Sequence, residues 1–129
     1  MIAVMERELQ HLVLERLEKL FGYAERKDYS NAVDYISYRG NNKARNFQEP
    51  ANALFEEDML LVKRICDRIA KIILESQGYE FFDFYYEEDR DGLWYVWEVH
   101  FSRNIIDNKI VHFRFLKFGE NYYLADIDS

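Results

Sequence analysis

The chain has 129 residues, of which 49% are hydrophobic, so it is long and apolar enough to fold as a single domain over residues 1–129. A formal net charge of −7 argues against a nucleic acid or an anionic membrane surface as a partner. One cysteine excludes an internal disulfide, and because neither a secretory signal nor a membrane span is visible, we expect a cytoplasmic protein.

The N-terminal part of the chain predicts two helices. Apolar residues at steps of three and four indicate an amphipathic helix from about residue 3 to 25. Its apolar stripe consists of Met5, Leu9, Leu12, Val13, Leu17, Leu20, Phe21 and Ala24. Asp28 is a good N-cap for a second helix over about 29–38, which Gly40 would end.

A third, longer helix is predicted further along the chain. Pro50 suits its first turn, because the N–H that proline lacks has no helical partner there. Helical spacing of apolar residues continues to Gln77, and Gly78 lies where a left-handed residue commonly follows a helix. The polar connection at 39–49 precedes this helix, and a short edge strand at 44–48 would fit within it. We expect this helix to be the central core element.

After Gly78 the period of apolar residues changes from helical to two, which predicts four strands. The gaps between them are short and turn-like, so neighbouring strands should form antiparallel hairpins. The strands are YEFFDFYYEE, LWYVWEVHFSR, IVHFRFLKF and YYLADID. The predicted fold class is α+β, with three N-terminal helices packed on one face of a C-terminal four-stranded antiparallel meander.

The register of the sheet follows from the requirement that apolar residues of neighbouring strands meet on one face. Matching those residues in the second and third strands pairs Phe101 with Phe113 and Val99 with Phe115. In the last hairpin the same matching sets Phe113 opposite Ile127. These side chains are therefore expected to face the helices.

The opposite face of the sheet should carry a row of polar residues. A three-residue turn, GEN, between the last two strands sets Arg114 opposite Asp126 and His112 opposite Asp128. The complete row consists of Glu98, His100, His112, Arg114 and Asp126. Its members come from three strands, so the row depends on the register.

Aromatic residues are in surplus, at 17% of the chain, and most of them follow Gly78. The first strand is largely apolar on both sides: its alternating sets are Phe82, Phe84 and Tyr86, and Phe81, Asp83 and Tyr85. A sheet covered by helices on one face has limited room for so many rings. We expect the surplus in a pocket, on a partner surface or at the sheet edges, with Trp97 in sheet packing and Trp94 at a partner or pocket.

Three segments resemble the nuclear transport factor 2-like superfamily. AERKDYSNAVDYI is similar to the turn between that family's first two helices, with Lys27 in place of the usual glycine. LWYVWEVHF lies where the family has its long central strand, and FRFLKFGENYYLADID is similar to its closing hairpin, with a tyrosine in place of a tryptophan. The resemblance implies a curved sheet that forms a cone with the helices, room for a pocket inside it, and frequent dimerisation through the sheet. It implies no single activity, because one fold carries many functions.

The polar row contains the parts of an acid–base site. A histidine beside a carboxylate can transfer protons near neutral pH, and an arginine can hold an anionic group with two hydrogen bonds. The catalytic candidates are His100, Asp126 and Asp83, and the ligand-binding candidates are Trp94, Glu98, His100, His112, Arg114 and Tyr85. The competing interpretation is that alternating charges on a sheet are cross-strand pairs on a solvated face, which is the more common case.

Other chemistry-bearing residues offer less. Isomerases and cyclases of the resembling family use an Asp or His inside the cone with a Tyr donor, so Asp83 with Tyr85 or Tyr35 is a second conceivable set, although no position matches a catalytic motif. His11 has no second ligand at helical spacing, and the sequence predicts neither a metal site nor a cofactor. Cys66 lies among apolar residues of the third helix and is expected to be a core thiol rather than a nucleophile.

The function predicted from these features is a small ligand- or protein-binding domain, without catalysis, that dimerises through its sheet. The aromatic surplus beside a missing catalytic constellation supports this hypothesis. Two alternatives stay open: an isomerase- or cyclase-like enzyme that acts on a small organic molecule in the cone pocket, and an acidic inhibitor or immunity-type protein with a basic partner. A cavity in which His100, Asp126 or Asp83 converge would favour the enzyme.

Overall fold

The computed structural model describes residues 2–39, 45, 49–90, 92–103 and 108–129. The elements are α1 (Ile2–Glu25), α2 (Tyr29–Ala32), the 3-10 helix η1 (Val33–Tyr35), β1 (Ser37–Tyr38), β2 (Glu49–Pro50), α3 (Glu56–Leu74), β3 (Gly78–Asp89), β4 (Gly92–Ser102), β5 (Asn108–Phe118) and β6 (Asn121–Asp128). The strands of the large sheet follow the order β3-β4-β5-β6, and all neighbours are antiparallel. The predicted α+β class, with helices before a four-stranded antiparallel meander, is confirmed.

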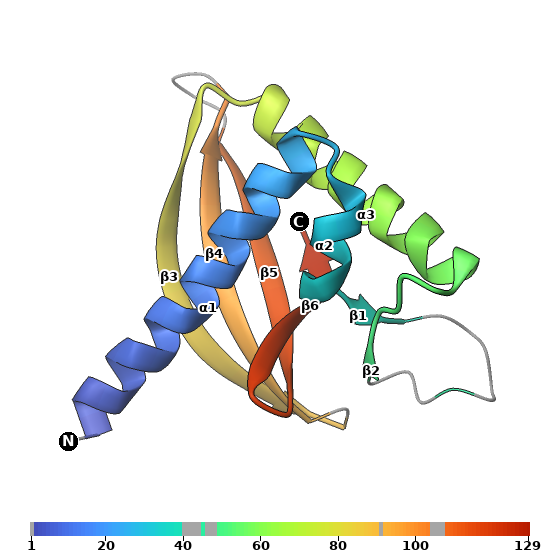
Figure 1. Ribbon diagram of the computed structural model, residues 1–129. Helices are drawn as coiled ribbons and strands as arrows, with labels where there is room; N and C mark the ends of the chain where they lie inside the picture. Colours follow the sequence, from blue (N-terminus) through green and yellow to red (C-terminus); the bar gives the residue numbers. More distant parts are fainter. Residues whose placement is uncertain (1, 40–44, 46–48, 91, 104–107) are drawn as a thin grey trace.

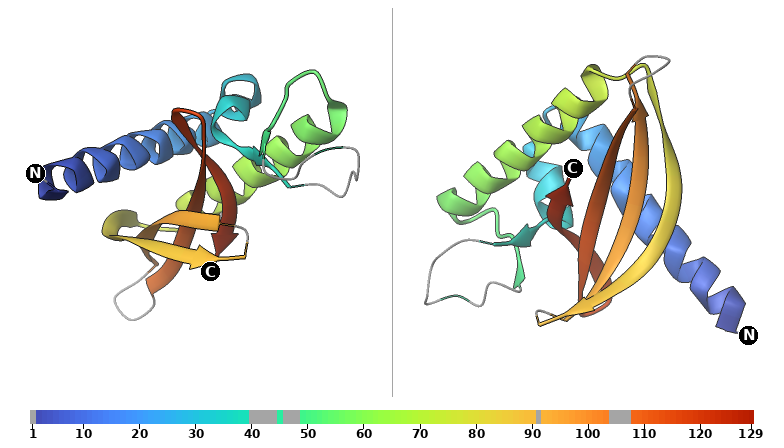
Figure 2. Two further views of the ribbon diagram at one scale, coloured as in Figure 1. Left: turned by 90° about the horizontal axis from the view of Figure 1, so that it is seen from below. Right: turned by 180° about the vertical axis from the view of Figure 1, so that it is seen from behind.

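The helices lie on one side of the large sheet (Figure 1). α1 crosses the strands diagonally, and α3 packs against α1. Seen from behind, the sheet is twisted and curved, and no described helix covers its other face (Figure 2). We call the side that packs on the helices the inner face and the opposite side the outer face. The core and the predicted polar row are therefore on opposite sides of one sheet.

Phe21 of α1 lies at the centre of the core between α1 and the inner face. Its side chain is 1% exposed, and its ring lies 5.2 to 6.3 Å from the rings of Tyr79, Phe81, Phe101 and Phe113. Aromatic pairs at these distances add to the stabilisation that burial of their surface supplies. The buried aliphatic residues around them include Val13, Leu17, Leu20, Ala24, Val62, Ile69, Val99, Val111 and Leu124.

The end of α1 agrees with the sequence prediction, and an unusual backbone conformation follows it. Lys27 has a φ of 57°, which is the left-handed region. The Lys27 N–H donates to the carbonyl of Ala24 at 3.2 Å and the Asp28 N–H to that of Tyr23 at 2.8 Å, which is the Schellman pattern at helix ends. A lysine Cβ is crowded in this conformation, whereas glycine has none.

Replacing Lys27 with glycine should therefore stabilise the protein by about 1 kcal/mol, because relief of the left-handed strain exceeds the extra freedom of the unfolded chain. The matched control is Arg26→Gly, one position earlier, where φ is not positive and glycine should destabilise. Urea unfolding of both variants measures the difference. A lower free energy of unfolding in Lys27→Gly would contradict the inference that the left-handed conformation of Lys27 is strained.

The predicted second helix, 29–38, is too long. The helical turns end at Tyr35, and the chain then enters β1, where Ser37 pairs with Pro50 of β2. Both residues of β1 are buried, so tertiary pairing outweighs the weak helical preference of a short apolar stripe. The edge strand proposed for 44–48 lies, apart from Arg45, outside the described residues.

The predicted third helix also begins too early. α3 starts at Glu56 rather than at Pro50, and Pro50 belongs to β2. Three acidic residues in the first turn of α3 complement the positive end of the helix dipole, which favours this start. The helix ends at Leu74, so Gly78 opens β3 instead of following the helix directly.

The predicted faces of β4 and β5 are confirmed, but the predicted pairing between them is wrong. Phe101 pairs with Lys109 rather than with Phe113, and the expected Val99–Phe115 pair is displaced in the same direction. The displacement is even, so every side chain remains on its predicted face. In the observed register Ser102 lies opposite Asn108, so the two strands pair up to positions close in sequence, whereas the predicted register would set Ser102 opposite His112.

The predicted pairs between β5 and β6 are confirmed, although a different backbone produces them. Arg114 lies opposite Asp126 and His112 opposite Asp128. The turn has two residues instead of three, and its glycine has a φ of 59°. Ala125 is an additional residue in β6, and this bulge restores the register that the shorter turn would have shifted.

A bulge at Phe82 corrects the predicted faces of β3. Phe81 pairs with Val99 and Asp83 with Glu98, so Phe82 has no residue opposite it. One extra residue reverses the alternation beyond the bulge. The inner face therefore receives Tyr79, Phe81, Phe84 and Tyr86. Each of the two alternating sets expected from the sequence is therefore divided between the two faces.

Candidate functional site

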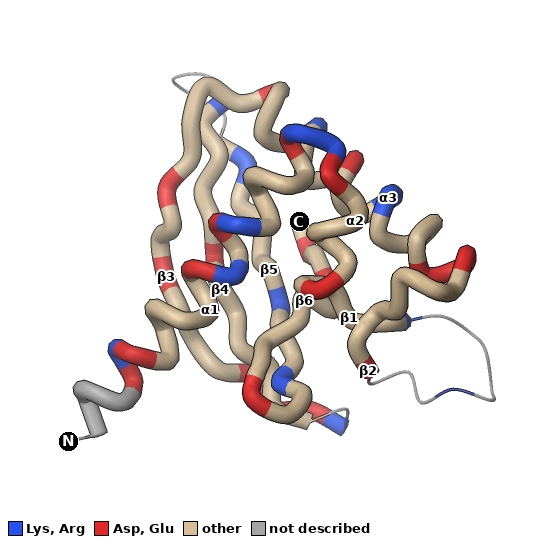
Figure 3. Tube along the Cα trace, viewed as in Figure 1, with Lys and Arg blue, Asp and Glu red and all other residues tan. Residues whose placement is uncertain are grey.

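The predicted polar row lies on the outer face. Glu98 and His100 come from β4, His112 and Arg114 from β5, and Asp126 from β6. The side chains of Glu98, His100, His112 and Arg114 are 20–27% exposed, so neighbours cover much of each one. Acidic positions recur along the strands of this sheet (Figure 3). The positions of these side chains are therefore set by the charged and aromatic groups that they contact.

Glu98 lies between the two histidines of the row. Its Oε2 is 2.6 Å from His100 Nε2, and its Oε1 is 3.3 Å from His112 Nε2. The hydrogen bond from His100, followed by that from His112, lowers the pKa of Glu98 below its usual value. The ring of Phe82 stacks on His100 at 4.1 Å, and that of Tyr85 lies edge-on to His112. Both carboxylate oxygens of Glu98 are thus occupied.

Arg114 is surrounded by three carboxylates. It donates a hydrogen bond from Nη1 to Glu87 and one from Nη2 to Asp128 Oδ2 at 3.3 Å. Its Nε lies 3.8 Å from Asp126 Oδ2 and has no hydrogen-bond partner among the described residues. The guanidinium is therefore held by acidic side chains of β3 and β6 and is not open to a substrate anion.

Trp94, a predicted ligand contact, is covered by its neighbours. Its side chain is 4% exposed and forms a small apolar cluster on the outer face with Val96 and Leu116. The indole Nε1–H donates to Asp89 Oδ1 at 2.9 Å, and the guanidinium of Arg39 lies 5.4 Å from the ring centre. These contacts connect the end of β3, the start of β4 and the end of β5 on the outer face.

The second predicted set is divided between the two sides of the sheet. Asp83 and Tyr85 lie on the outer face of β3. Tyr35 belongs to η1 on the helical side, where it packs against Tyr23 and the guanidinium of Arg16. Burial raises the pKa of Tyr85 above its usual value, so its hydroxyl is protonated at neutral pH. The structure does not bring Tyr35 to the other two.

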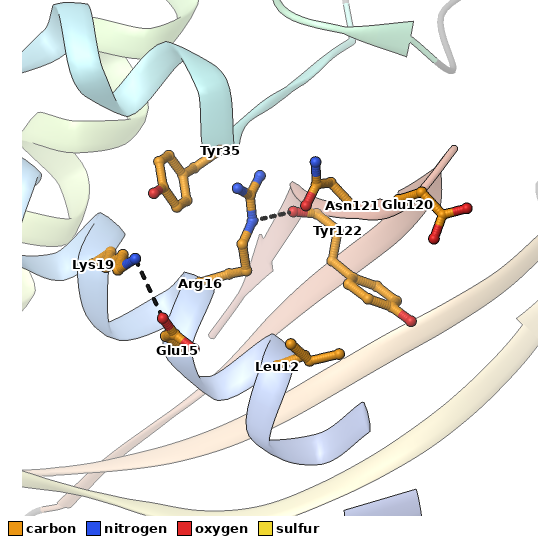
Figure 4. A pocket seen from close by; sticks show the side chains of 8 residues that line it. All are labelled: Leu12, Glu15, Arg16, Lys19, Tyr35, Glu120, Asn121 and Tyr122. Atoms are coloured by element: carbon orange, nitrogen blue, oxygen red, sulfur yellow. Dashed lines mark hydrogen bonds and ion pairs between the residues drawn. The ribbon is translucent and has the colours of Figure 1, made fainter. Parts of the chain in front are cut away.

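A cleft of about 230 Å³ lies between α1, η1 and the start of β6 (Figure 4). Its lining residues are Leu12, Glu15, Arg16, Lys19, Tyr35, Glu120, Asn121 and Tyr122. Of the residues singled out in the sequence as site candidates, only Tyr35 contributes to it. Leu12 was expected in the core, yet it is 51% exposed here. The sequence carried no signal for this cleft, because its walls come from segments far apart in the chain.

A buried ion pair that the sequence did not reveal lies between α3 and the connection before it. Asp58 is 0% exposed and accepts hydrogen bonds from Arg45 at 2.5 and 2.9 Å and from the Asn52 N–H at 2.7 Å. The Arg45 guanidinium lies 3.6 Å from the centre of the Tyr38 ring and 4.6 Å from that of Phe55. All the carboxylate contacts are internal, so this group is structural.

Cys66 is buried in α3, as predicted, and burial raises the pKa of its thiol to about 12. A thiol with that pKa stays protonated and is a poor nucleophile. His11 is exposed on α1. Across the described residues, His, Cys, Asp and Glu side chains form no group of three or more that could hold a metal ion. None of the described helices combines the length and apolar character that crossing a bilayer requires.

Comparison with known proteins yields no protein-family model, no curated protein and no solved structure that matches this chain. The resemblance to the nuclear transport factor 2-like superfamily therefore stays an expectation from the sequence segments. Function has to be argued from the surfaces and side chains themselves, because a fold alone does not define one.

Proposed function

We propose that this chain is a small binding domain without catalysis, and that its outer sheet face docks against a basic surface of a partner protein. The composition of that face carries the proposal. Phe82 and Ile110 are 58% and 45% exposed there, beside the stacked His100 ring. Among the described residues, the carboxylates of this face are Glu80, Asp83, Glu87, Asp89, Glu98, Asp126 and Asp128. These carboxylates outnumber the positively charged side chains described on the same face. Arg114, near the middle of the face, is one of those cations.

Charge decides between the possible occupants of this face. A second copy, as the sequence predicted, would bring two acidic surfaces together, and like charges across an interface oppose association. A basic partner would be attracted by the same carboxylates and would cover the exposed rings. The inhibitor or immunity-type alternative uses the same surface and partner chemistry, so it falls within this proposal.

Two observations favour binding over the isomerase- or cyclase-like alternative. Acid–base catalysis requires a group that can reach a substrate proton. Glu98 is engaged by both histidines, and Arg114 is engaged by neighbouring carboxylates. The cleft beside α1 is lined by none of the predicted catalytic groups, which are His100, Asp126 and Asp83.

The test is a titration of ¹⁵N-labelled protein with oligolysine, followed by amide NMR, with oligoglutamate as the charge-reversed peptide. We expect oligolysine shifts on β3 to β6 and none with oligoglutamate. The double variant Glu80→Lys, Asp83→Lys should bind oligolysine about tenfold more weakly. The matched control is Glu8→Lys, Glu18→Lys on α1, which changes the net charge equally on the helical side and should have a smaller effect.

Three results would overturn the proposal. Equal losses in the two double variants would mean that oligolysine responds only to net charge. Shifts concentrated on α1 would place binding elsewhere. A stable dimer in native mass spectrometry that dissociates on Phe82→Asp would replace the basic partner with a second copy of the chain.

A further inference from the structure

A half-buried guanidinium lies at the cleft between α1 and β6 (Figure 4). Arg16 Nε donates to the carbonyl of Tyr122 at 2.8 Å, and Nη2 donates to the carbonyl of Asp34 at 2.7 Å. The guanidinium carbon lies 3.9 Å from the centre of the Tyr35 ring and 5.1 Å from that of Tyr123. These contacts come from η1 and β6, and they hold the guanidinium in one orientation.

The nearby Asp34 carboxylate attracts this guanidinium but forms no ion pair with it. Arginine has five N–H donors, and both hydrogen bonds of Arg16 go to uncharged carbonyls. Among the described residues no carboxylate forms an ion pair with it: Glu15 pairs with Lys19 at 3.2 Å, and the Glu120 carboxylate points away (Figure 4). Burial lowers the pKa of Arg16 below its usual value. An anion at the unused N–H groups would compensate this desolvation.

The remaining walls of the cleft indicate the kind of anion. Leu12 presents an exposed apolar surface one helical turn before Arg16 in the α1 wall of the cleft, and Tyr122 lines the cleft from β6. Lys19 also lines the cleft but is paired with Glu15, so Arg16 is the cation without an ion-pair partner among the described lining residues, and one negative charge matches it better than the two of phosphate. The volume of about 230 Å³ is below the roughly 300–1,000 Å³ of pockets for drug-sized ligands. The cleft therefore suits a small, singly charged ligand with an apolar part.

We propose that this cleft binds a small carboxylic acid, with its carboxylate on the unused N–H groups of Arg16 and its apolar body on Leu12. The planar guanidinium matches the two oxygens of a carboxylate, and the rings around it restrict its motion before the ligand arrives. The cleft lies on the helical side of the sheet, so the inference does not depend on the function proposed for the outer face.

The test is an NMR titration that follows the Arg16 Nε–H and the Leu12 methyl groups. The probes are acetate, 3-methylbutanoate and benzoate, with benzamide as the uncharged analogue of benzoate and inorganic phosphate as the second anion. We expect saturable shifts at Arg16 with the acids, tighter binding of 3-methylbutanoate than of acetate, and benzamide and phosphate about tenfold weaker than benzoate.

Two variants separate the charge from the apolar contact. Arg16→Lys keeps the charge but loses the fork of donors, so benzoate should bind about tenfold more weakly. Leu12→Ala should weaken 3-methylbutanoate and leave acetate unchanged. Leu54→Ala is the matched control, because Leu54 is 89% exposed and lies outside the cleft. Arg16 also links α1 to η1 and β6, so the unfolding midpoint of Arg16→Lys is measured to show that the variant is folded. Leu12 is exposed, so Leu12→Ala tests the cleft without changing those links.

Several outcomes would overturn the proposal. The first is that none of the three acids produces a saturable shift at Arg16. The second is that benzamide binds as tightly as benzoate, which would remove the role of the charge. The third is that phosphate binds more tightly than every acid, which would assign the cleft to a different class of anion. None of these outcomes bears on oligolysine binding at the outer face.

Discussion

Phe21→Ala should lower the free energy of unfolding by about 4 kcal/mol. The Phe21 side chain is 1% exposed and contacts four other rings, so its removal leaves a cavity that neighbours on three strands cannot fill by small shifts. Loss of buried apolar surface and the cavity both contribute to the cost. Urea unfolding monitored by tryptophan fluorescence measures the change.

Phe82→Ala is the matched control, because it removes the same side chain from the outer face. Phe82 is 58% exposed and its described ring contact is the stack on His100, so the cost should stay below about 1 kcal/mol. If the two variants lose the same free energy of unfolding, the assignment of Phe82 to the outer face by the bulge in β3 is wrong. A small effect at Phe21 would remove that residue from the centre of the core.

Asp58→Asn should cost about 3 kcal/mol, the second large effect that we expect. The variant keeps the shape of the side chain but removes the buried charge that pairs with Arg45, so the guanidinium between Tyr38 and Phe55 keeps only its more exposed partners, Glu49 and Glu57. It also weakens the bond that the Asn52 N–H donates to the carboxylate. The measurement is the free energy of unfolding at neutral pH.

The pH dependence of this effect has a defined sign. Burial opposes ionisation of Asp58, but hydrogen bonds from Arg45 and Asn52 outweigh it, and the pKa of Asp58 is lowered. The stabilisation is therefore fully present above the pKa of an unfolded aspartate, about 3.9, and is lost as the pH falls through the lower pKa of the folded state. The difference between the wild type and Asp58→Asn should shrink in acid.

Glu57→Gln is the control for this pair. Glu57 lies 3.1 Å from the same guanidinium, but its side chain is 50% exposed, so its loss should cost less than about 1 kcal/mol. A Glu57→Gln cost equal to that of Asp58→Asn would contradict the assignment of Asp58 as the buried partner.

Much of the polar row was predictable because the alternation of a strand assigns each side chain to a face. The prediction survived two errors in the backbone. The predicted pairing of β4 with β5 differs from the observed one by an even number of residues, so each side chain keeps its face. The turn before β6 is one residue shorter than predicted, and the bulge at Ala125 compensates for the missing residue. In β3 no compensation occurred, and the bulge at Phe82 reversed the expected faces. The role of the row was not predictable, because it depends on which charges pair across strands.

The sequence by itself determined the fold class, the extent of α1, the four strands of the sheet and the shared face of Glu98, His100, His112, Arg114 and Asp126. Each of these follows from the periods of 3.6 and 2, which are properties of a short stretch of chain. The tertiary structure decided where α3 begins, that Arg45 pairs with Asp58, and that Arg16 lies in a cleft against β6 without an ion-pair partner among the described residues. These depend on segments distant in sequence, and no local pattern of residues encodes the distance between such segments.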